Sequence, residues 1–309
     1  MSPPAADTLP QESAQRRDLE IEAQPYVQMI VENIQATKAL CPLDTQYKVV
    51  KMMPSFNNVY SLLGFTTLDI DLENAVLQNQ SIVKLMPDIR YVMGECEGAL
   101  EVTSADKVIA TSNITDAWKA FNTSPVHAFY EHSLKTEWGC IQLALGRDPE
   151  SIAILGSGAM PETAVWVKVW AKQRDKRVQI HSLELLPERL EKSIKVIDAL
   201  CDLQDCTFES GDIRAVPRDL REYDAVYFNA SVGRTTTEKE DLLLHVVSRM
   251  RPGAVVLARS THSIKTMVYP PTKLQTQRVL AKLRPYMTCQ LNGEQGKNVN
   301  ASFIVSRVV

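Results

Sequence analysis

A glycine-rich turn after a short apolar run is the segment whose residue types and spacing point most directly to chemistry. Residues 151–155 lead into Gly156-Ser157-Gly158-Ala-Met160-Pro161, after which the apolar spacing becomes helical. Glycine allows a tight turn and the close approach of a ligand to bare backbone, and the next helix offers free N–H groups. Pro161 stands where a dinucleotide fingerprint has its third glycine, which argues against a bound pyrophosphate and favours a smaller nucleoside ligand. An isolated turn of this kind can also serve only to join a strand to a helix.

Polar residues follow the next three apolar runs, at positions suited to the rest of a nucleoside. Glu184 ends the second run and could accept both hydroxyls of a ribose. Asp212 could accept a hydrogen bond from an adenine amino group, and Ile213 could cover the ring. The segment Asn229-Ala230-Ser231-Val232 is small and polar, and we expect it beside the reacting end of the ligand. The order of these features favours S-adenosylmethionine over a nicotinamide cofactor.

These residues need a scaffold that gathers strand ends, and the second half of the chain predicts one. Short β-rich runs at residues 152–155, 178–180, 225–228, 255–257 and 303–305 alternate with amphipathic helical stretches. That alternation is typical of a doubly wound parallel sheet, which binds ligands at the carboxyl ends of its strands. We therefore predict the α/β class, with a Rossmann-type S-adenosylmethionine-binding domain at residues 148–309.

The first half of the chain has a different pattern. In residues 24–147 apolar side chains recur at helical spacing, which predicts an N-terminal helical-bundle domain that closes over the ligand. Residues 1–23 are rich in Pro, Ala, Gln and charge without apolar periodicity, and we expect a flexible arm there. The boundary is expected where Gly146 and Pro149 bracket two charges.

Composition narrows the class of partner. The 309 residues are 45% hydrophobic and 23% charged with a net charge of −3, which gives no electrostatic case for a nucleic-acid partner. The six cysteines form no pair or histidine spacing typical of a metal site, so we expect reduced thiols and no bound metal. Without a bilayer-spanning run or a signal-like start, we expect a cytoplasmic protein with no membrane partner. The oligomeric state stays open, a homodimer included.

Several segments together resemble the nicotianamine synthase family. Family members carry segments similar to Gly156-Ser-Gly-Ala-Met-Pro161, to Asn229-Ala-Ser-Val-Gly233 and to Arg259-Ser-Thr-His262, in this order. Upstream, Asn58-Val-Tyr60 and especially Gly94-Glu-Cys-Glu97-Gly-Ala-Leu-Glu101 are similar to further family segments, so the resemblance covers roughly residues 40–309.

This resemblance implies an unusual use of S-adenosylmethionine. An amine attacks the γ-carbon of the methionine part and methylthioadenosine leaves, so the group donated is aminocarboxypropyl. Glu97 matches the family's catalytic glutamate and could accept the proton of the amine or hold the amine in place. Without the resemblance, Glu95, Glu97 and Glu101 would be interpreted as a solvated helical face.

The chain departs from the family in one aromatic segment. Where the family has a Tyr-Tyr-Asp-Asn-Tyr segment, Phe129 replaces the first tyrosine, Tyr130 keeps the second and Ser133 replaces the third. The loss of two hydroxyls removes partners for an incoming amino acid and leaves an apolar, cation-friendly wall. We therefore place Phe129 and Tyr130 with Glu97 in the catalytic set.

These changes favour cyclisation of S-adenosylmethionine by its own amine to azetidine-2-carboxylate and methylthioadenosine. Three alternatives stay open. They are aminocarboxypropyl transfer to a separate amine in metallophore synthesis, a small-molecule methyltransferase, and a non-catalytic S-adenosylmethionine-binding module.

Overall fold

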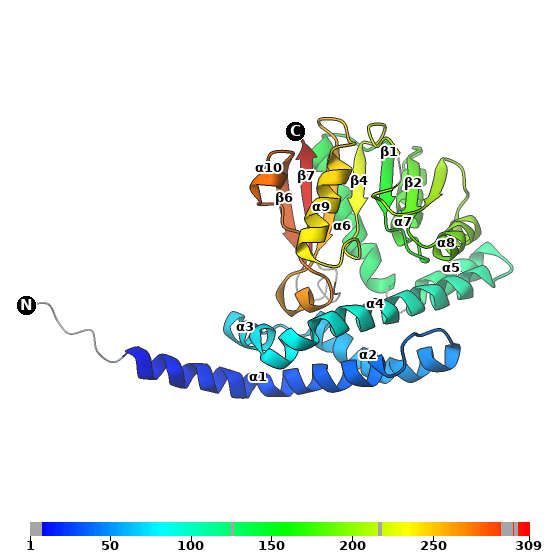
Figure 1. Ribbon diagram of the computed structural model, residues 1–309. Coiled ribbons are helices and arrows are strands. Elements are labelled where there is room, and N and C mark those ends of the chain that lie inside the picture. The colour runs from blue at the N-terminus through cyan, green and yellow to red at the C-terminus, as the bar shows by residue number, and fades with distance from the viewer. Residues whose placement is uncertain (1–7, 125–126, 216–217, 292–298, 300–301) are drawn as a thin grey trace, which may run out of the picture. The chain divides into compact units, whose positions relative to one another are not determined.

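The computed structural model describes residues 8–124, 127–215, 218–291, 299 and 302–309, and the chain divides into two compact units. The first unit consists of Met1–Cys96 with Ser263–Val268, and the second of Glu97–His262 with Tyr269–Val309. Most helices and strands of both units are labelled in Figure 1. Each unit has its own fold and is described separately below.

The first unit is helical. It contains α1 (Thr8–Lys38), α2 (Gln46–Phe65), α3 (Ile70–Gln78), the first half of α4 (Gln80–Ile109) and the short 3-10 helix η1 (Ser263–Met267). Helix α1 packs against α2 and α3. Buried side chains spaced three or four residues apart, such as Ile30 with Ile34 and Met52 with Phe56, supply the core. Thr45 and Asp69 accept backbone N–H bonds at the starts of α2 and α3, as N-caps do.

The predicted flexible arm is wrong for residues 8–23, because α1 already begins at Thr8. Residues 1–7 lie outside the described part of the chain. The described side chains from Arg16 to Glu22 are exposed or partly exposed, and Ala23 is the first buried one. Glu, Gln, Arg and Ala have high helix propensity, so the helix continues through a stretch whose few apolar side chains, such as Ile21, are not buried. Apolar periodicity reports which face is buried, and its absence here did not exclude a helix.

The second unit is built around a seven-stranded sheet in the order β3-β2-β1-β4-β5-β7-β6. Five strands run parallel, while β7 is antiparallel to β5 and β6 is antiparallel to β7. The strands are β1 (Ser151–Leu155), β2 (Gln179–Glu184), β3 (Cys206–Ser210), β4 (Ala225–Phe228), β5 (Val255–Ser260), β6 (Leu283–Gln290) and β7 (Ser302–Val308). All five predicted β-rich runs are strands, and the predicted α/β class is confirmed.

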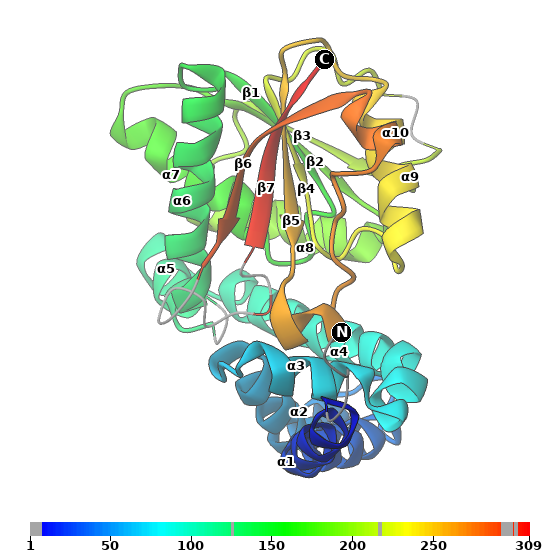
Figure 2. The ribbon, with the colours of Figure 1, turned by 90° about the vertical axis from the view of Figure 1, so that its left-hand side faces the viewer.

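Helices cover both faces of this sheet. One face carries α5 (Ile114–Asn122), α6 (His127–Leu145), α7 (Glu162–Gln173) and α8 (Pro187–Leu200), and the other carries α9 (Thr236–Val247) and α10 (Gln277–Leu280). Figure 2 shows α6 and α7 on one side of the sheet and α9 and α10 on the other. The central strands are therefore buried on both faces, which is why β1, β4 and β5 have no exposed residue.

The compact units divide at Cys96 and Glu97, whereas the expected boundary lay at residue 148. The second half of α4 and all of α5 and α6 belong to the sheet unit. Their apolar residues, including Phe121 and Trp138, share one core with Ile154 of β1 and Val165 of α7. A change from helical spacing to strand–helix alternation locates the first strand, but a helix upstream of it can still cover the sheet. In the described part of the chain, none of the helices is long and apolar enough to span a membrane.

Candidate active site

The glycine turn follows β1 at the carboxyl edge of the sheet. Gly156 and Gly158 have φ values of +79° and +71°, a backbone conformation that side chains with a Cβ rarely adopt. The N–H groups of Gly156 and Ser157 both donate to the carbonyl of Leu183, at 2.8 and 3.1 Å. A Cβ on Gly156 would lie 3.1 Å from a methyl group of Val232. The predicted loop is therefore present. It is hydrogen-bonded to β2 on one side and lies against the segment after β4 on the other.

Glu184 lies at the end of β2, as predicted, and its carboxylate is buried beneath the loop. It accepts hydrogen bonds from the N–H of Gly158 at 2.8 Å and from the N–H of Leu186 at 3.2 Å. A carboxylate has further lone pairs beyond these two bonds, which are the ones available to a ribose. Glu184 thus fixes the loop conformation in addition to any contact with a ligand.

The segment after β4 also reaches the loop, although its polar side chain is used within the protein. The Asn229 amide donates to the carbonyl of Gly156 at 2.7 Å and accepts from Arg259 at 2.7 Å. The carbonyl of Ala230 accepts a hydrogen bond from the buried ammonium group of Lys239. Of the four predicted residues here, Ser231 is exposed and Val232 is partly exposed. Asn229 is therefore a support for the loop.

Arg259, near the end of β5, is the centre of a buried ionic cluster. Its Nε and Nη2 donate to the two oxygens of Glu137 at 2.9 and 2.7 Å, and Nη2 also donates to Thr163 at 2.9 Å. Burial alone would lower the pKa of the guanidinium, but the charge and hydrogen bonds of Glu137 raise it. The cluster therefore carries a permanently charged arginine that joins α6, α7, β5 and the end of β4.

Two carboxylates of α4 lie in the same unit, one helical turn apart. The hydroxyl of Tyr269 donates to Glu97. Glu101 accepts from the N–H of Ala159 at 3.4 Å, and its Oε2 lies 2.7 Å from the place where a Cβ on Gly158 would be. The carbonyl of Tyr269 accepts from Thr261 at 2.6 Å, so the phenol is held from the β5 side. Glu97 faces a phenol, and Glu101 faces the glycine loop.

Burial raises the pKa of both carboxyl groups to about 7. For Glu97 the hydrogen bond from Tyr269 opposes the effect of burial, and the charge of Glu101 adds to it. For Glu101 the nearby Arg189 charge lowers the pKa, while Glu184 and Glu162 raise it further. Burial and the Glu97 charge raise the pKa of Tyr269 well above its ordinary value, so the phenol keeps its proton. Near neutral pH, Glu97 can therefore take up or release a proton.

Tyr130, on α6, is partly buried, and its phenol is an electrostatic neighbour of Arg259 and Tyr269. The side chain of Phe129 lies outside the described residues, so its catalytic role stays a prediction. Ser133 is buried and donates to the carbonyl of Tyr130 at 3.1 Å. Its hydroxyl is thus used within its own helix.

Most of the remaining predicted residues are buried, and their side chains pack in the core of the sheet unit. Met160 is buried in the core on the α6–α8 face, and Pro161 is buried at the start of α7. Ser157 is buried, and its hydroxyl has no hydrogen-bond partner among the described residues. Ile213 packs against the core on the α9 face.

Asp212 is engaged by a neighbouring cation. It accepts from the backbone N–H of Arg214 at 2.8 Å and from the guanidinium Nη2 at 2.6 Å. These hydrogen bonds lower the pKa of Asp212. An adenine amino group would have to share this carboxylate with Arg214.

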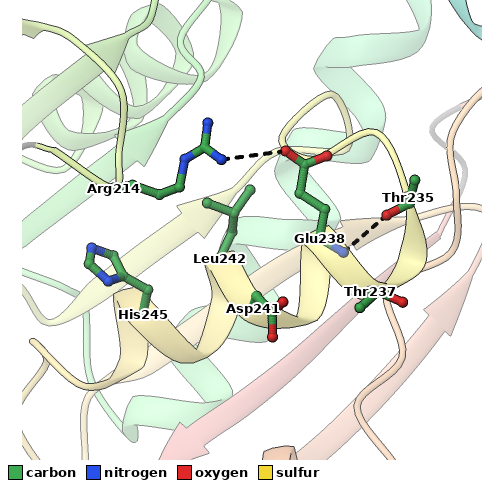
Figure 3. Close-up of a pocket in the computed structure, with 7 residues that line it drawn as sticks. All are labelled: Arg214, Thr235, Thr237, Glu238, Asp241, Leu242 and His245. Atoms are coloured by element: carbon green, nitrogen blue, oxygen red, sulfur yellow. Dashed lines mark hydrogen bonds and ion pairs between the residues drawn. The ribbon is translucent and has the colours of Figure 1, made fainter.

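Arg214 also borders an open hollow of about 510 Å³ along α9. Figure 3 shows Arg214 directed toward Glu238, 3.9 Å away, with Thr235, Thr237, Asp241, Leu242 and His245 around the hollow. None of the predicted site residues lines it. No group of three or more His, Cys, Asp or Glu side chains that could hold a metal occurs among the residues described.

A comparison with protein families decides the classification. The model described as "Nicotianamine synthase protein" matches residues 22–307, which is most of the chain. The chain belongs to the nicotianamine synthase family. The resemblance inferred from the glycine loop and the Glu97 segment is therefore confirmed.

Curated relatives agree with this family. The chain is similar to a probable nicotianamine synthase 4 of Arabidopsis thaliana, with 28% identity over 67% of this chain and 64% of that protein. It is 30% identical to nicotianamine synthase 3 of the same plant over 63% of this chain and 61% of that protein. It is 24% identical to nicotianamine synthase 3 of Oryza sativa subsp. japonica over 81% of this chain and 72% of that protein. The chain thus spans less than two thirds of the length of both Arabidopsis relatives.

Solved structures confirm the nicotianamine synthase fold. The structure of MtNAS in complex with MTA and tNA has a TM-score of 0.72 and 16% identity, over 93% of this chain and 98% of that chain. A mutant of MtNAS in complex with S-adenosylmethionine has a TM-score of 0.68 and 17% identity, over 90% and 97% of the two chains. At this level of identity the likeness concerns the fold.

Several residues of the candidate site could not be predicted from the sequence. Glu137 and Tyr269 had no local signal, because their partners are far away in the chain. Glu101 had one, since a glutamate four residues after Glu97 must lie on the same helical face. Arg259 stood in a family-like segment, but nothing in that segment indicates that the arginine is buried in an ion pair.

Proposed function

We propose that this member of the nicotianamine synthase family binds S-adenosylmethionine at the glycine loop and uses its aminocarboxypropyl group, releasing methylthioadenosine. The observation that carries the proposal is the Glu97 carboxyl group, whose pKa is raised to about 7 and which accepts the Tyr269 hydroxyl. The chemistry needs a base for an amine near neutral pH, and Glu97 has a pKa suited to that task. The relatives named nicotianamine synthase and the MtNAS structure with S-adenosylmethionine support the same assignment.

The charge around the loop suits a sulfonium. Glu101 and Glu184 both accept hydrogen bonds from the loop, and Glu162 adds a third carboxylate close enough to influence Glu101. Arg189 is the cation whose charge opposes them at Glu101. A positively charged ligand at Gly158 would reduce the repulsion among these carboxylates, so the site favours a sulfonium over the neutral thioether that leaves.

The reaction balances with Glu97 as the only base. The amine begins as an ammonium group and loses one proton to Glu97. Its nitrogen then attacks the γ-carbon, the bond between that carbon and sulfur breaks, and the electron pair goes to sulfur to give methylthioadenosine. Tyr269 keeps its proton and stabilises the anionic form of Glu97, so the phenol orients the base.

We infer that the attacking amine is that of S-adenosylmethionine itself, which closes a four-membered ring and gives azetidine-2-carboxylate. Phe129 carries no hydroxyl, and the Ser133 hydroxyl is bonded to the carbonyl of Tyr130. Neither side chain then offers the polar grip that a second amino acid needs. Transfer to a separate amine is the alternative that the relatives' names favour.

One experiment separates these outcomes. The purified protein is incubated with S-adenosylmethionine alone, then with added amino acids, and every product is identified by mass. Methylthioadenosine with azetidine-2-carboxylate from S-adenosylmethionine alone supports cyclisation. Methylthioadenosine that requires an added amine, or that accompanies a self-condensation product, supports intermolecular transfer. Adenosylhomocysteine would indicate methyl transfer, and binding without any product would indicate a non-catalytic module. Either result overturns the proposal.

A further inference from the structure

The glycine loop is held by a hydrogen bond whose donor depends on a buried arginine. The Asn229 amide nitrogen donates to the carbonyl of Gly156 at 2.7 Å, and its amide oxygen accepts from Arg259 Nη1 at 2.7 Å. Arginine can only donate and a carbonyl can only accept. If the amide turned over, both contacts would be lost together, so Arg259 selects the amide orientation that reaches Gly156.

The Arg259 side chain is held in place by bonds other than the one to Asn229. Two of its nitrogens bind both oxygens of Glu137, and one of these also donates to Thr163. Arg259 and Glu137 have side chains only 7% and 3% exposed, so water competes little for these bonds. The fork geometry leaves Nη1 directed to Asn229, which a lysine ammonium on a flexible stem would not reproduce.

We propose that Arg259 is a positioning residue for the cofactor, acting through Asn229 on the glycine loop. This inference rests on the proposed function, because it assumes that S-adenosylmethionine binds at that loop. The path runs from Glu137 on α6 through Arg259 on β5 and Asn229 after β4 to Gly156 after β1. Each step is a single hydrogen bond or ion pair between buried or partly buried groups, so the support acts without touching the ligand.

The test is a double-mutant cycle read in the dissociation constant for methylthioadenosine by calorimetry. Arg259→Lys keeps a positive charge beside Glu137 but removes the fork, and Asn229→Ala removes the relay. We expect each variant to raise the dissociation constant about tenfold, as the loss of one strong hydrogen bond does. The double variant should be no weaker than the weaker single variant, because both remove the same link.

Thr163→Val is the matched control. It removes one bond of Arg259 on the α7 side and leaves the bonds to Glu137 and Asn229 in place. Its dissociation constant should stay within about twofold of that of the unchanged protein. A hundredfold effect in the double variant would mean that the two residues act independently, and an unchanged constant in Arg259→Lys would mean that Arg259 does not act on the loop. Either result overturns the inference.

A second measurement keeps the inference separate from the proposed function. Amide hydrogen exchange of the loop at residues 156–160 should become faster in Arg259→Lys and in Asn229→Ala, and stay unchanged in Thr163→Val. If the unchanged protein bound neither S-adenosylmethionine nor methylthioadenosine, the proposed function would fail, and loop exchange alone would decide the role of Arg259. Unchanged loop exchange in Arg259→Lys would overturn it in every case.

Discussion

Two ionic clusters, each centred on a buried side chain, lie at opposite edges of the same sheet. At the carboxyl edge, Arg259 is bonded to Glu137 and passes a further bond to Asn229. At the amino edge, Asp224 precedes β4 and accepts from Arg147 at 2.6 and 2.9 Å and from Arg251. Both clusters join elements far apart in the chain, and both place an ionised group among atoms that exclude water.

The two clusters differ in the parts of the chain that they connect. Asp224 also accepts from the backbone N–H of Glu150 at 2.7 Å, so the amino-edge cluster ties together the starts of β1, β4 and β5. The carboxyl-edge cluster leads into the glycine loop, beside carboxyl groups whose pKa values are raised to about 7. Similar ion-pair chemistry therefore serves stability at one edge and the candidate site at the other. In open α/β sheets ligands bind at the carboxyl edge, which explains the asymmetry.

The largest expected effect is on turnover at the carboxyl edge. Glu97→Gln keeps the shape of the side chain but removes the base, so methylthioadenosine release should slow by roughly 10²–10⁴-fold. The dissociation constant for S-adenosylmethionine should change little, because the role of Glu97 is in the transition state. Product release followed by mass and binding followed by calorimetry check both parts. Glu95→Gln, on the same helix, is the control and should keep full turnover. A Glu97→Gln enzyme as fast as the unchanged protein would remove Glu97 from the mechanism.

The next effect is on stability at the amino edge. Asp224→Asn leaves Arg147 and Arg251 without their anion, and we expect the free energy of unfolding to fall by about 3 kcal/mol, the low end for breaking a buried pair. We take the low value because both arginines are roughly half exposed, so water can partly solvate their charges after the change. Urea unfolding measures it. Affinity for methylthioadenosine should not change in the folded variant. A tenfold weaker affinity would contradict the separation of the two edges.

The stability that the two edges contribute should also change with pH in opposite directions. Glu97 and Glu101 have folded pKa values of about 7, above the ordinary 4.5, so their contribution to stability is full below about pH 4.5 and is lost as pH rises to about 7. Each group can account for about 1.4 kcal/mol per pH unit in that window. The pKa of Asp224 is lowered, because hydrogen bonds from Arg147 and Glu150 outweigh burial. Its contribution is present above pH 3.8 and is lost as pH falls through its lowered pKa.

Urea midpoints measured from pH 3 to pH 8 test this contrast. The double variant Glu97→Gln with Glu101→Gln should flatten the decline between about pH 4.5 and pH 7, and Asp224→Asn should flatten only the acid limb. If the double variant declined as steeply as the unchanged protein, the raised pKa values would not belong to these two carboxyl groups.

The smallest expected effect concerns Arg214. Its guanidinium occupies the Asp212 carboxylate that we predict for adenine. Arg214→Ala should release that carboxylate and lower the dissociation constant for methylthioadenosine by about two- to threefold, since exposed ion pairs are weak. Arg221→Ala is the control, because Arg221 is also an exposed arginine between β3 and β4. A weaker affinity in Arg214→Ala would mean that Arg214 itself contacts the ligand.

The site could be predicted where it depends on neighbours in the chain. Gly156 and Gly158, with their positive φ values, follow the first strand, and Glu184 ends the second. Their meeting could be predicted because the carboxyl ends of parallel strands lie together. The role of Asn229 did not follow. The sequence predicts a polar residue at a strand end, but its amide is used by Arg259 and Gly156 in the folded chain.

Local pattern was sufficient for the β-rich runs, the glycine turn and the helical first half, because periodicity and backbone freedom are properties of consecutive residues. The ionic partners were decided only by the tertiary structure. Arg259 and Glu137 are 122 positions apart, and Tyr269 and Glu97 are 172 apart. A carboxyl group on an exposed helix face and one pressed against a glycine loop have the same sequence signature. Only burial by distant segments raises the pKa of Glu97 and Glu101, and that burial is what turns a helical face into a candidate active site.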